Sequence, residues 1–109
     1  MADSALPLRK LTMDVTEDDG ATVTLLCRGE LVAGNSEEFK SQVKALAASH
    51  QYVLADMSLV NYVDSSGLGD IVGAFLSAKT AGCSLQIIKA HPRFRDLLNT
   101  TRLASVLEG

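Results

Sequence analysis

The side chains of this chain that are best suited to chemistry stand in one hexapeptide, which contains two adjacent serines. The hexapeptide consists of Asp64, Ser65, Ser66, Gly67, Leu68 and Gly69. A serine hydroxyl can accept a phosphate, and Asp, Ser and Gly are residues favoured at the start of a helix. Since one cap uses only one side chain, we predict that at least one serine hydroxyl is exposed and free at a helix start.

Phosphorylation of such a serine would act on a partner protein and leave the fold intact. A phosphate brings a charge of about −2, which a helix N-terminus favours by roughly 0.3–1 kcal/mol. The same charge caught in a docked interface would cost several kcal/mol. Because about 1.4 kcal/mol is tenfold in affinity, one phosphate would lower binding by orders of magnitude. Gly67 and Gly69 remove side chains from the first turn, which would let a partner approach closely.

The rest of the chain offers no set of groups for catalysis. His50 and His91 are not spaced to meet a nucleophile, and we expect them at the surface or at a helix cap. Glu37-Glu38 suits a helix N-terminus, and Asp18-Asp19 suits a turn. No His, Cys, Asp or Glu cluster has the spacing of a zinc or calcium site. We therefore predict that the chain is not an enzyme and uses no metal or cofactor.

The glycines of this region do not form a phosphate-binding loop. Gly67, Gly69 and Gly73 follow an expected strand and enter a helix, as nucleotide-binding loops do. The third glycine falls one residue too late for the dinucleotide fingerprint, and no Gly-Lys-Ser/Thr sequence is present. The next strand ends in Ile88-Lys89, without the acidic residue expected to hold a ribose. Nucleotide-dependent catalysis is therefore not predicted.

The composition predicts one cytoplasmic domain over residues 1–109, with 1–7 as a flexible N-terminus. The 109 residues are 47% hydrophobic and 21% charged, which is typical of a soluble globular domain. A formal net charge of −3 argues against a nucleic-acid binder, which needs an excess of Lys and Arg. Cys27 and Cys83 stand far apart in apolar stretches, which predicts buried thiols. No run of about 18 apolar residues indicates a membrane span.

The hexapeptide must be positioned by the elements around it, and these begin with a hairpin. Residues 11–15 alternate apolar and polar side chains, which predicts a strand with one buried face. Residues 23–27 repeat this pattern, so we expect a second strand antiparallel to the first. Residues 17–20 supply the turn between them, with Gly20 in the positive φ of a tight hairpin. Residues 29–34 are then expected to form a short extension and loop.

Helices alternate with buried strands after this hairpin. We expect a helix capped by Asn35 or Ser36, followed by a central strand over 52–56 that is covered on both faces. The helix that begins at the hexapeptide should run to about Thr80 and end at Gly82, and a strand over 84–88 should follow it. The last expected helix begins at Pro92, with a tail packed against the domain at Leu103, Val106 and Leu107. The predicted fold class is α/β. Its mixed β-sheet combines the antiparallel hairpin with parallel central strands, flanked by about four helices.

Two motifs resemble those of the STAS domain, the fold of bacterial anti-sigma factor antagonists. Residues 63–69 (Val-Asp-Ser-Ser-Gly-Leu-Gly) resemble the phosphorylation signature of that family almost letter for letter. Residues 28–31 (Arg-Gly-Glu-Leu) resemble the turn that follows its second strand. The resemblance covers nearly the whole chain and implies a STAS-type fold.

The resemblance implies partner switching. The unphosphorylated domain would bind an anti-sigma factor that is also a serine kinase, and so release the sigma factor. ATP-dependent phosphorylation would end binding, and a metal-dependent serine phosphatase would restore it. Ser66 carries over as the phosphoacceptor. The partner would dock on Asp64, Ser65, Ser66, Gly67, Leu68 and Gly69, with no role for nucleic acid or membrane.

One departure keeps other hypotheses open. Many STAS relatives carry an Asp directly after Gly-Glu-Leu, where this chain has Val32 followed by Ala33, Gly34 and Asn35. The missing carboxylate is compatible with an atypical kinase, or with a non-switching scaffold or transporter-associated subunit. A small-molecule-binding domain is a third alternative, which would need an apolar pocket with a few polar groups. The chain is expected to be a monomer or a weak homodimer paired through its hairpin edge.

Overall fold

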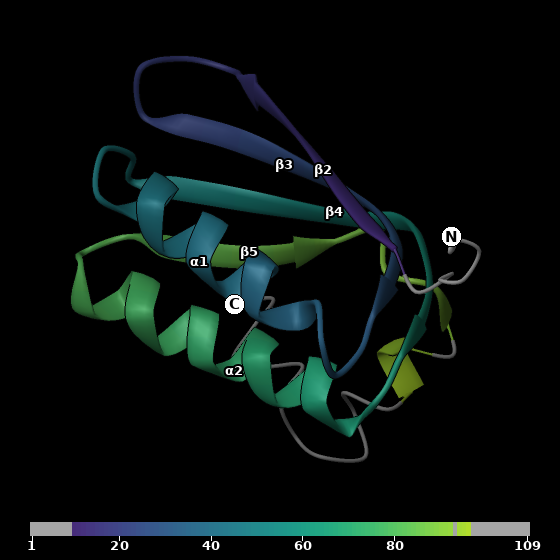
Figure 1. The fold of residues 1–109 in the computed structure, drawn as a ribbon. Coiled ribbons are helices and arrows are strands. Elements are labelled where there is room, and N and C mark those ends of the chain that lie inside the picture. Colours follow the sequence, from purple (N-terminus) through teal and green to yellow (C-terminus); the bar gives the residue numbers. More distant parts are fainter. Residues whose placement is uncertain (1–9, 93, 97–109) are drawn as a thin grey trace, which may run out of the picture.

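The computed structural model describes residues 10–92 and 94–96, which form a four-stranded sheet and two long helices (Figure 1). The sheet order is β2-β3-β4-β5, with β2 antiparallel to β3 and the other neighbours parallel. This arrangement confirms the predicted mixed α/β fold class. The elements are β2 (Leu11–Glu17), β3 (Thr22–Leu31), α1 (Ser36–Ala47), β4 (Tyr52–Val63), α2 (Ser65–Thr80) and β5 (Ser84–Ile88).

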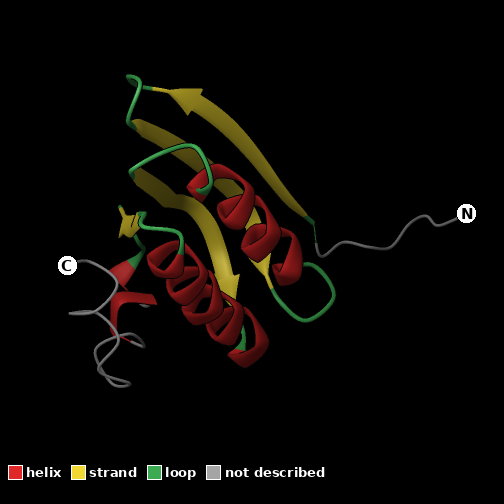
Figure 2. Ribbon diagram, turned by 90° about the vertical axis from the view of Figure 1, so that its left-hand side faces the viewer, coloured by secondary structure: helices red, strands yellow, loops and turns green. Residues whose placement is uncertain are grey.

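Both helices lie on the same face of the sheet (Figure 2). Each one connects two parallel strands, since α1 runs between β3 and β4, and α2 runs between β4 and β5. Two crossovers of the same hand place their helices side by side on one face. The starts of α1 and α2 therefore lie at the same end of the domain, where β3 and β4 end (Figure 1).

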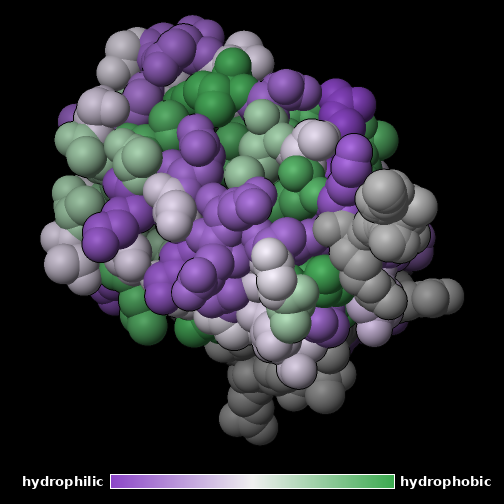
Figure 3. All heavy atoms as spheres, in the orientation of Figure 1, coloured by the Kyte–Doolittle hydropathy of each residue, from purple (hydrophilic) through white to green (hydrophobic). Residues whose placement is uncertain are grey.

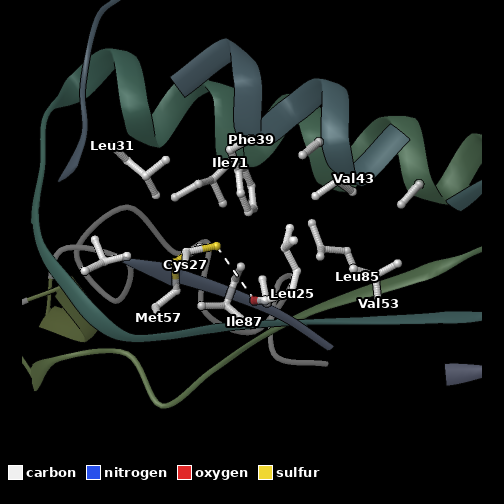
Figure 4. Close-up of a cluster of buried hydrophobic side chains, with 14 of the residues drawn as sticks. Leu25, Cys27, Leu31, Phe39, Val43, Val53, Met57, Ile71, Leu85 and Ile87 are labelled. Atoms are coloured by element: carbon white, nitrogen blue, oxygen red, sulfur yellow. Dashed lines mark hydrogen bonds between the residues drawn. The ribbon is translucent and has the colours of Figure 1, made fainter. Parts of the chain in front are cut away.

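The core fills the space between this helix pair and the sheet (Figure 4). Alternate residues of β3 and β5 point into it, as the period of two of a strand requires, and side chains of β4 and of both helices complete it. These side chains are fully or almost fully buried, and each contributes roughly 1.5–3 kcal/mol by leaving water. The largest fully buried side chains of the strands and helices are Val23, Leu25, Cys27 and Leu31 from β3, Phe39 and Val43 from α1, Val53 and Met57 from β4, Ile71 from α2, and Leu85 from β5.

The two cysteines are free thiols inside this core, as the sequence predicts. Cys27 is fully buried beneath the helices, and Cys83 is 5% exposed just before β5. Burial, and to a lesser extent the negative charge of Asp56, raise the pKa of the Cys27 thiol to about 12. Burial also raises the pKa of Cys83. Both groups therefore stay protonated and act as small apolar side chains.

The hairpin turn forms, but its expected cause is wrong. Gly20 does not have a positive φ. Asp19 makes the turn instead, because its Oδ1 accepts hydrogen bonds from the N–H groups of Ala21 at 2.7 Å and Thr22 at 2.8 Å. The expected buried face of β2 is also incomplete, since Val15 is 43% exposed. The helices pack on β3, β4 and β5, so the outer end of this edge strand has no cover among the described residues.

The second strand is longer than expected, because residues 28–31 continue β3 and do not form a turn after it. Gly29 makes this continuation possible. Its φ is +112°, and a Cβ there would lie 2.1 Å from the carbonyl oxygen of Lys10. Only glycine fits such a close approach of two backbones.

The central strand also runs seven residues past its predicted end at Asp56, to Val63. Two β-bulges interrupt its pairing with β3, one after Asp56 and one after Val60. Each bulge places an extra residue in β4 and breaks the period of two from which strands are predicted. The expected cover on both faces is not found either, since Tyr52 is 45% exposed in a sheet whose two described helices share one face.

The ends of the helices follow local chemistry in part. Gly82 ends α2 as expected, with a φ of +82° and the N–H of Cys83 donating to the carbonyl of Ala78 at 2.8 Å. Asn35 is the N-cap residue of α1, but its side chain does not cap the helix. Its Oδ1 accepts from the N–H of Val32 at 3.0 Å and closes the preceding loop instead.

Pro92 and residues 94–96 are helical, whereas the remainder of the last expected helix, the tail and residues 1–7 lie outside the described residues.

His50 caps the C-terminal end of α1 and links it to the hairpin. Its Nδ1 donates to the carbonyl of Leu46 at 2.9 Å, and its Nε2 lies 2.8 Å from Oε2 of Glu17. Both ring nitrogens therefore face acceptors, an arrangement that only the protonated ring satisfies. The hydrogen bond to Glu17 is the main cause that raises the pKa of His50, followed by the one to Leu46. Its expected capping role is thus confirmed.

This contact predicts that the domain loses stability as the pH rises. A raised folded-state pKa gives a contribution that is complete below the usual value of about 6.5 and is lost as the pH passes through the raised pKa. Urea unfolding between pH 6 and pH 9 should therefore show a falling free energy of unfolding. Glu17→Gln should flatten this slope, and Glu37→Gln, which changes an exposed carboxylate on α1, should leave it unchanged. Equal slopes in all three proteins would contradict the interpretation.

Candidate functional site

Asp64 holds the start of α2 and joins it to the neighbouring strand. Its Oδ1 accepts a hydrogen bond from the N–H of Gly67 at 2.8 Å, which is the N-terminal cap of the helix. Its Oδ2 accepts from the N–H of Ala33 at 3.1 Å, in the loop after β3. Its own N–H donates to the carbonyl of Leu31 at 3.1 Å. One residue therefore ties together the two loops that follow β3 and β4.

The two serines lie inside the first turn of α2 and are both exposed. Ser65 is the first helical residue and Ser66 is the second. Because Asp64 supplies the cap, neither serine hydroxyl is needed for it. Within residues 10–92 and 94–96, the hydroxyls of Ser65 and Ser66 have no hydrogen-bond partner. Two free hydroxyl groups are therefore accessible at the helix start.

Gly67 and Gly69 have different roles in the first turn, although the sequence predicted that both leave room for a partner to approach. Gly67 is buried, and a Cβ there would lie 2.1 Å from the carbonyl oxygen of Leu31. Its missing side chain lets α2 pack against the end of β3, so this glycine serves the interior of the domain. Gly69 is exposed, with no atom within 4 Å of a Cβ placed there. Of the two, only Gly69 leaves open space on the outer surface.

Helix α1 packs against α2 in the turns that follow the serines and holds them in place. Ser36 is almost completely buried, and its hydroxyl donates to Oδ2 of Asp70 at 2.5 Å. One turn further along both helices, the side chain of Lys40 lies across Gly73, with Cε 3.1 Å from where a Cβ would be. The small size of Gly73 thus lets the two helices approach. Asp70 stands one turn after Ser66, so this contact anchors the turn that carries the serines.

Val32 occupies the position at which the sequence departs from the STAS pattern. Its side chain is 3% exposed, and its N–H is held by Asn35 at 3.0 Å. This position therefore faces the interior and offers a partner no charge. The exposed carboxylates of this end are Glu37 and Glu38, in the first turn of α1, as the sequence predicts.

The other residues considered for chemistry do not assemble into a site. His50 pairs with Glu17, and His91 is exposed beside Phe94 on another part of the surface. Asp18 and Asp19 lie in the hairpin turn. Within the described part of the chain, no three His, Cys, Asp or Glu side chains are grouped to hold a metal ion. No helix in that part is long and apolar enough to cross a membrane.

A groove of about 680 Å³ lies beside the second half of β4, where β5 has ended. Apolar side chains dominate its lining, and none of the hexapeptide residues is among the described residues that line it. Among the described residues, the groove and the serines therefore share no lining residue. Its described lining consists of Ser58, Leu59, Val60, Asn61, Tyr62, Val63, His91 and Phe94.

The chain belongs to the STAS domain family, whose model matches residues 12–108. The match includes both motifs that suggested this family from the sequence. Among its relatives is an anti-sigma-B factor antagonist from Listeria monocytogenes, 27% identical over 99 residues. That alignment covers 90% of this chain and 87% of the relative. Anti-sigma factor antagonists are thus relatives of the chain over nearly its whole length.

Solved structures establish the same fold. An anti-sigma factor antagonist from Mycobacterium paratuberculosis superposes with a TM-score of 0.77 at 19% identity, covering 91% of this chain and 84% of that one. The Bacillus cell fate determinant SpoIIAA in its phosphorylated form superposes with a TM-score of 0.70 at 15% identity, covering 90% and 89%. The architecture of this chain is therefore that of the STAS domain.

Sequence reasoning missed the residues that position the serines from a distance. The N–H of Ala33, the carbonyl of Leu31 and the hydroxyl of Ser36 all contact the start of α2 from more than thirty positions away. No local sequence pattern indicates these contacts, since every residue has the same backbone groups and the sequence does not distinguish a buried serine from an exposed one. The only available clue was the Gly-Glu-Leu motif, which ends at Leu31.

The double role of Asp64 predicts a substantial effect of its removal. Asp64→Ala should destabilise the domain by about 1–2 kcal/mol, because the helix loses its cap and the N–H of Ala33 loses its acceptor. Asp64→Asn keeps an oxygen for capping and should lose less. Guanidinium unfolding measures both variants. Equal losses in the two variants would show that the hydrogen bonds of Asp64 are not what matters.

The two glycines predict opposite effects of the same substitution. Gly67→Ala should destabilise the domain by about 2 kcal/mol or more, because its Cβ would clash with the backbone of Leu31. Gly69→Ala should leave stability unchanged or raise it by about 0.5–1 kcal/mol, since alanine favours the helix and meets no neighbour. Thermal unfolding of both variants checks this. A stable Gly67→Ala protein would contradict the packing described here.

Proposed function

We propose that this chain is an anti-sigma factor antagonist that acts as a partner switch. The unphosphorylated domain binds an anti-sigma factor that is also a serine kinase, and this binding releases a sigma factor. Phosphorylation of the domain ends the binding, and a serine phosphatase restores it. The domain itself is a ligand and a substrate in this cycle, not an enzyme. The antagonist from Listeria supports the antagonist role.

The observation that carries the proposal is the exposed hydroxyl of Ser66 in the first turn of α2. A kinase needs a serine that reaches its active site without unfolding of the substrate, and Ser66 meets this condition. The Oγ of Ser66 attacks the γ-phosphorus of ATP, the bond to the bridging oxygen breaks, and ADP leaves. The hydroxyl proton passes to a base of the kinase. The product is a phosphoserine at the helix start.

The docking surface proposed for the anti-sigma factor consists of the exposed part of the hexapeptide. Ser65, Ser66 and Gly69 are exposed, and Leu68 is partly buried against the core. The other two members, Asp64 and Gly67, support this surface from beneath through the cap and the contact with Leu31. A partner that lies on this first turn meets backbone and small side chains at close range.

A phosphate on Ser66 would weaken the complex with the partner and leave the fold of the domain stable. Both helices begin at this end of the domain, and helix N-termini attract negative charge. The free domain therefore accommodates the new charge. In the complex the same charge would lose its water, and the unsatisfied charge would weaken binding by several kcal/mol.

Non-switching STAS domains are the alternative, and charge at Ser66 distinguishes them. A scaffold would bind its partner equally well with a neutral or a charged residue at this position. The buried Val32 leaves the kinase without the carboxylate that many STAS relatives present there, so recognition rests on the first turn of α2 and its neighbours. Ser66→Ala and Ser66→Asp decide between the two functions.

We expect Ser66→Asp to lower the affinity for the anti-sigma factor at least 100-fold, because it places a charge inside the interface. Ser66→Ala should bind within about threefold of the unchanged chain. Both variants should melt within a few degrees of it, since the side chain is exposed. Isothermal titration calorimetry and thermal unfolding provide these values. Equal affinity of Ser66→Asp and Ser66→Ala would favour a scaffold.

Phosphorylation supplies a second test with a matched control at the neighbouring serine. The chain is incubated with the anti-sigma factor and ATP, and mass spectrometry then locates the phosphate. Ser65→Ala should still gain one phosphate, on Ser66, whereas Ser66→Ala should gain none. A phosphate on Ser65 in the Ser66→Ala variant would show that the kinase does not select its position.

A further inference from the structure

We propose that the anti-sigma factor docks along the whole outer face of α2, as far as Leu76, and contacts Leu76 through an apolar surface of its own. This inference rests on the proposed function, because it extends the docking surface at the start of the same helix. It adds an anchor residue that lies outside the phosphorylation motif.

The outer face of α2 is a continuous stripe that begins at the serines. Ser65, Gly69, Val72 and Leu76 follow one another at intervals of four, three and four residues, so they share one side of the helix. The buried residues of α2, among them Ile71, lie on the opposite side. Leu76 therefore points away from the core, in line with Ser65 and Gly69.

Leu76 is the most exposed large apolar side chain in the described part of the chain, at 56%. The other large apolar side chains that are exposed there all belong to the strands β2 and β4. Val72, one turn before Leu76, is partly exposed as well. An apolar anchor thus stands on the same helix face as Ser65, the neighbour of the proposed phosphorylation site, about 16 Å from Ser65 along the axis.

The charge pattern indicates the chemistry of the surface that covers this stripe. No charged residue stands between Asp70 and Lys79 on α2, whereas α1 presents Glu37, Glu38 and Lys44 to solvent. In Figure 3, hydrophilic residues fill the middle of this side of the molecule, and hydrophobic residues reach the surface along the lower margin, over α2. The matching surface of the partner is therefore apolar and uncharged.

A specific interface also buries more surface area than the start of α2 alone offers. A stable complex buries about 800 Å² on each partner. Two serines, a glycine and one edge of a partly buried leucine cannot supply this area. Extension along α2 adds Val72 and Leu76 without any charge to desolvate, and buried apolar anchors of this kind carry most of the energy of an interface.

Leu76→Ser tests the inference, with Leu59→Ser as the matched control. Leu59 is 47% exposed and lies on β4, away from α2, so both substitutions remove the same side chain from a similarly exposed position. The unmodified chain, the two variants and Ser66→Asp are titrated with the purified anti-sigma factor that binds the unmodified chain. Leu76→Lys serves as a second variant, and thermal unfolding verifies that each protein is folded.

We expect Leu76→Ser to weaken binding about tenfold and Leu76→Lys more, with Leu59→Ser within twofold of the unmodified chain. Unchanged binding of the Leu76 variants, or equal weakening by Leu59→Ser, would overturn the inference. If the Leu76 variants bind normally while Ser66→Asp does not bind, only the extended surface is wrong. If Ser66→Asp also binds normally, or no anti-sigma factor binds the unmodified chain, the proposed function itself fails.

Discussion

The arrangement of this end of the domain depends on the hydrogen bonds of Asp64. The carboxylate accepts from the N–H of Gly67 within its own helix and from the N–H of Ala33 in the loop after β3. These two N–H groups belong to segments that are more than thirty residues apart. A single acceptor thus fixes the start of α2 relative to the neighbouring strand, and it leaves the serine hydroxyls without a structural task.

The close packing beneath the serines supports this cap. Gly67 lies against the carbonyl of Leu31, and Ser36 binds Asp70 one turn further along α2. The first turn of the helix is therefore held from below and from one side, while Ser65 and Ser66 stay exposed. This packing suits a phosphorylation site, because the new charge changes which partner can dock but does not loosen α2, which carries the serine.

The core and the functional surface use different parts of the same helix. The buried side of α2 presents Ile71 to the sheet, and the outer side presents Gly69 and Leu76 to solvent. Helices that cover one face of a sheet always divide in this way. In this domain the outer side is unusual because it carries an exposed leucine and no charge for eight residues, from Ile71 to Ala78.

The sequence alone determined the class of fold, since periods of two and of 3.6 residues mark strands and helices before any contact is known. It failed where that period breaks, as in the bulges that carry β4 on to Val63, and where two residues compete for one turn, as Asp19 and Gly20 do.

The sequence also indicated Ser66, because the motif around it is local. Only the tertiary structure showed which of the neighbouring residues is the cap, and that Gly67 packs inward while Gly69 faces outward. Both distinctions involve backbone groups at the end of β3 and in the loop after it, and a sequence does not state where distant backbone atoms lie. Local patterns encode local structure, and contacts across the fold are settled when the chain has packed.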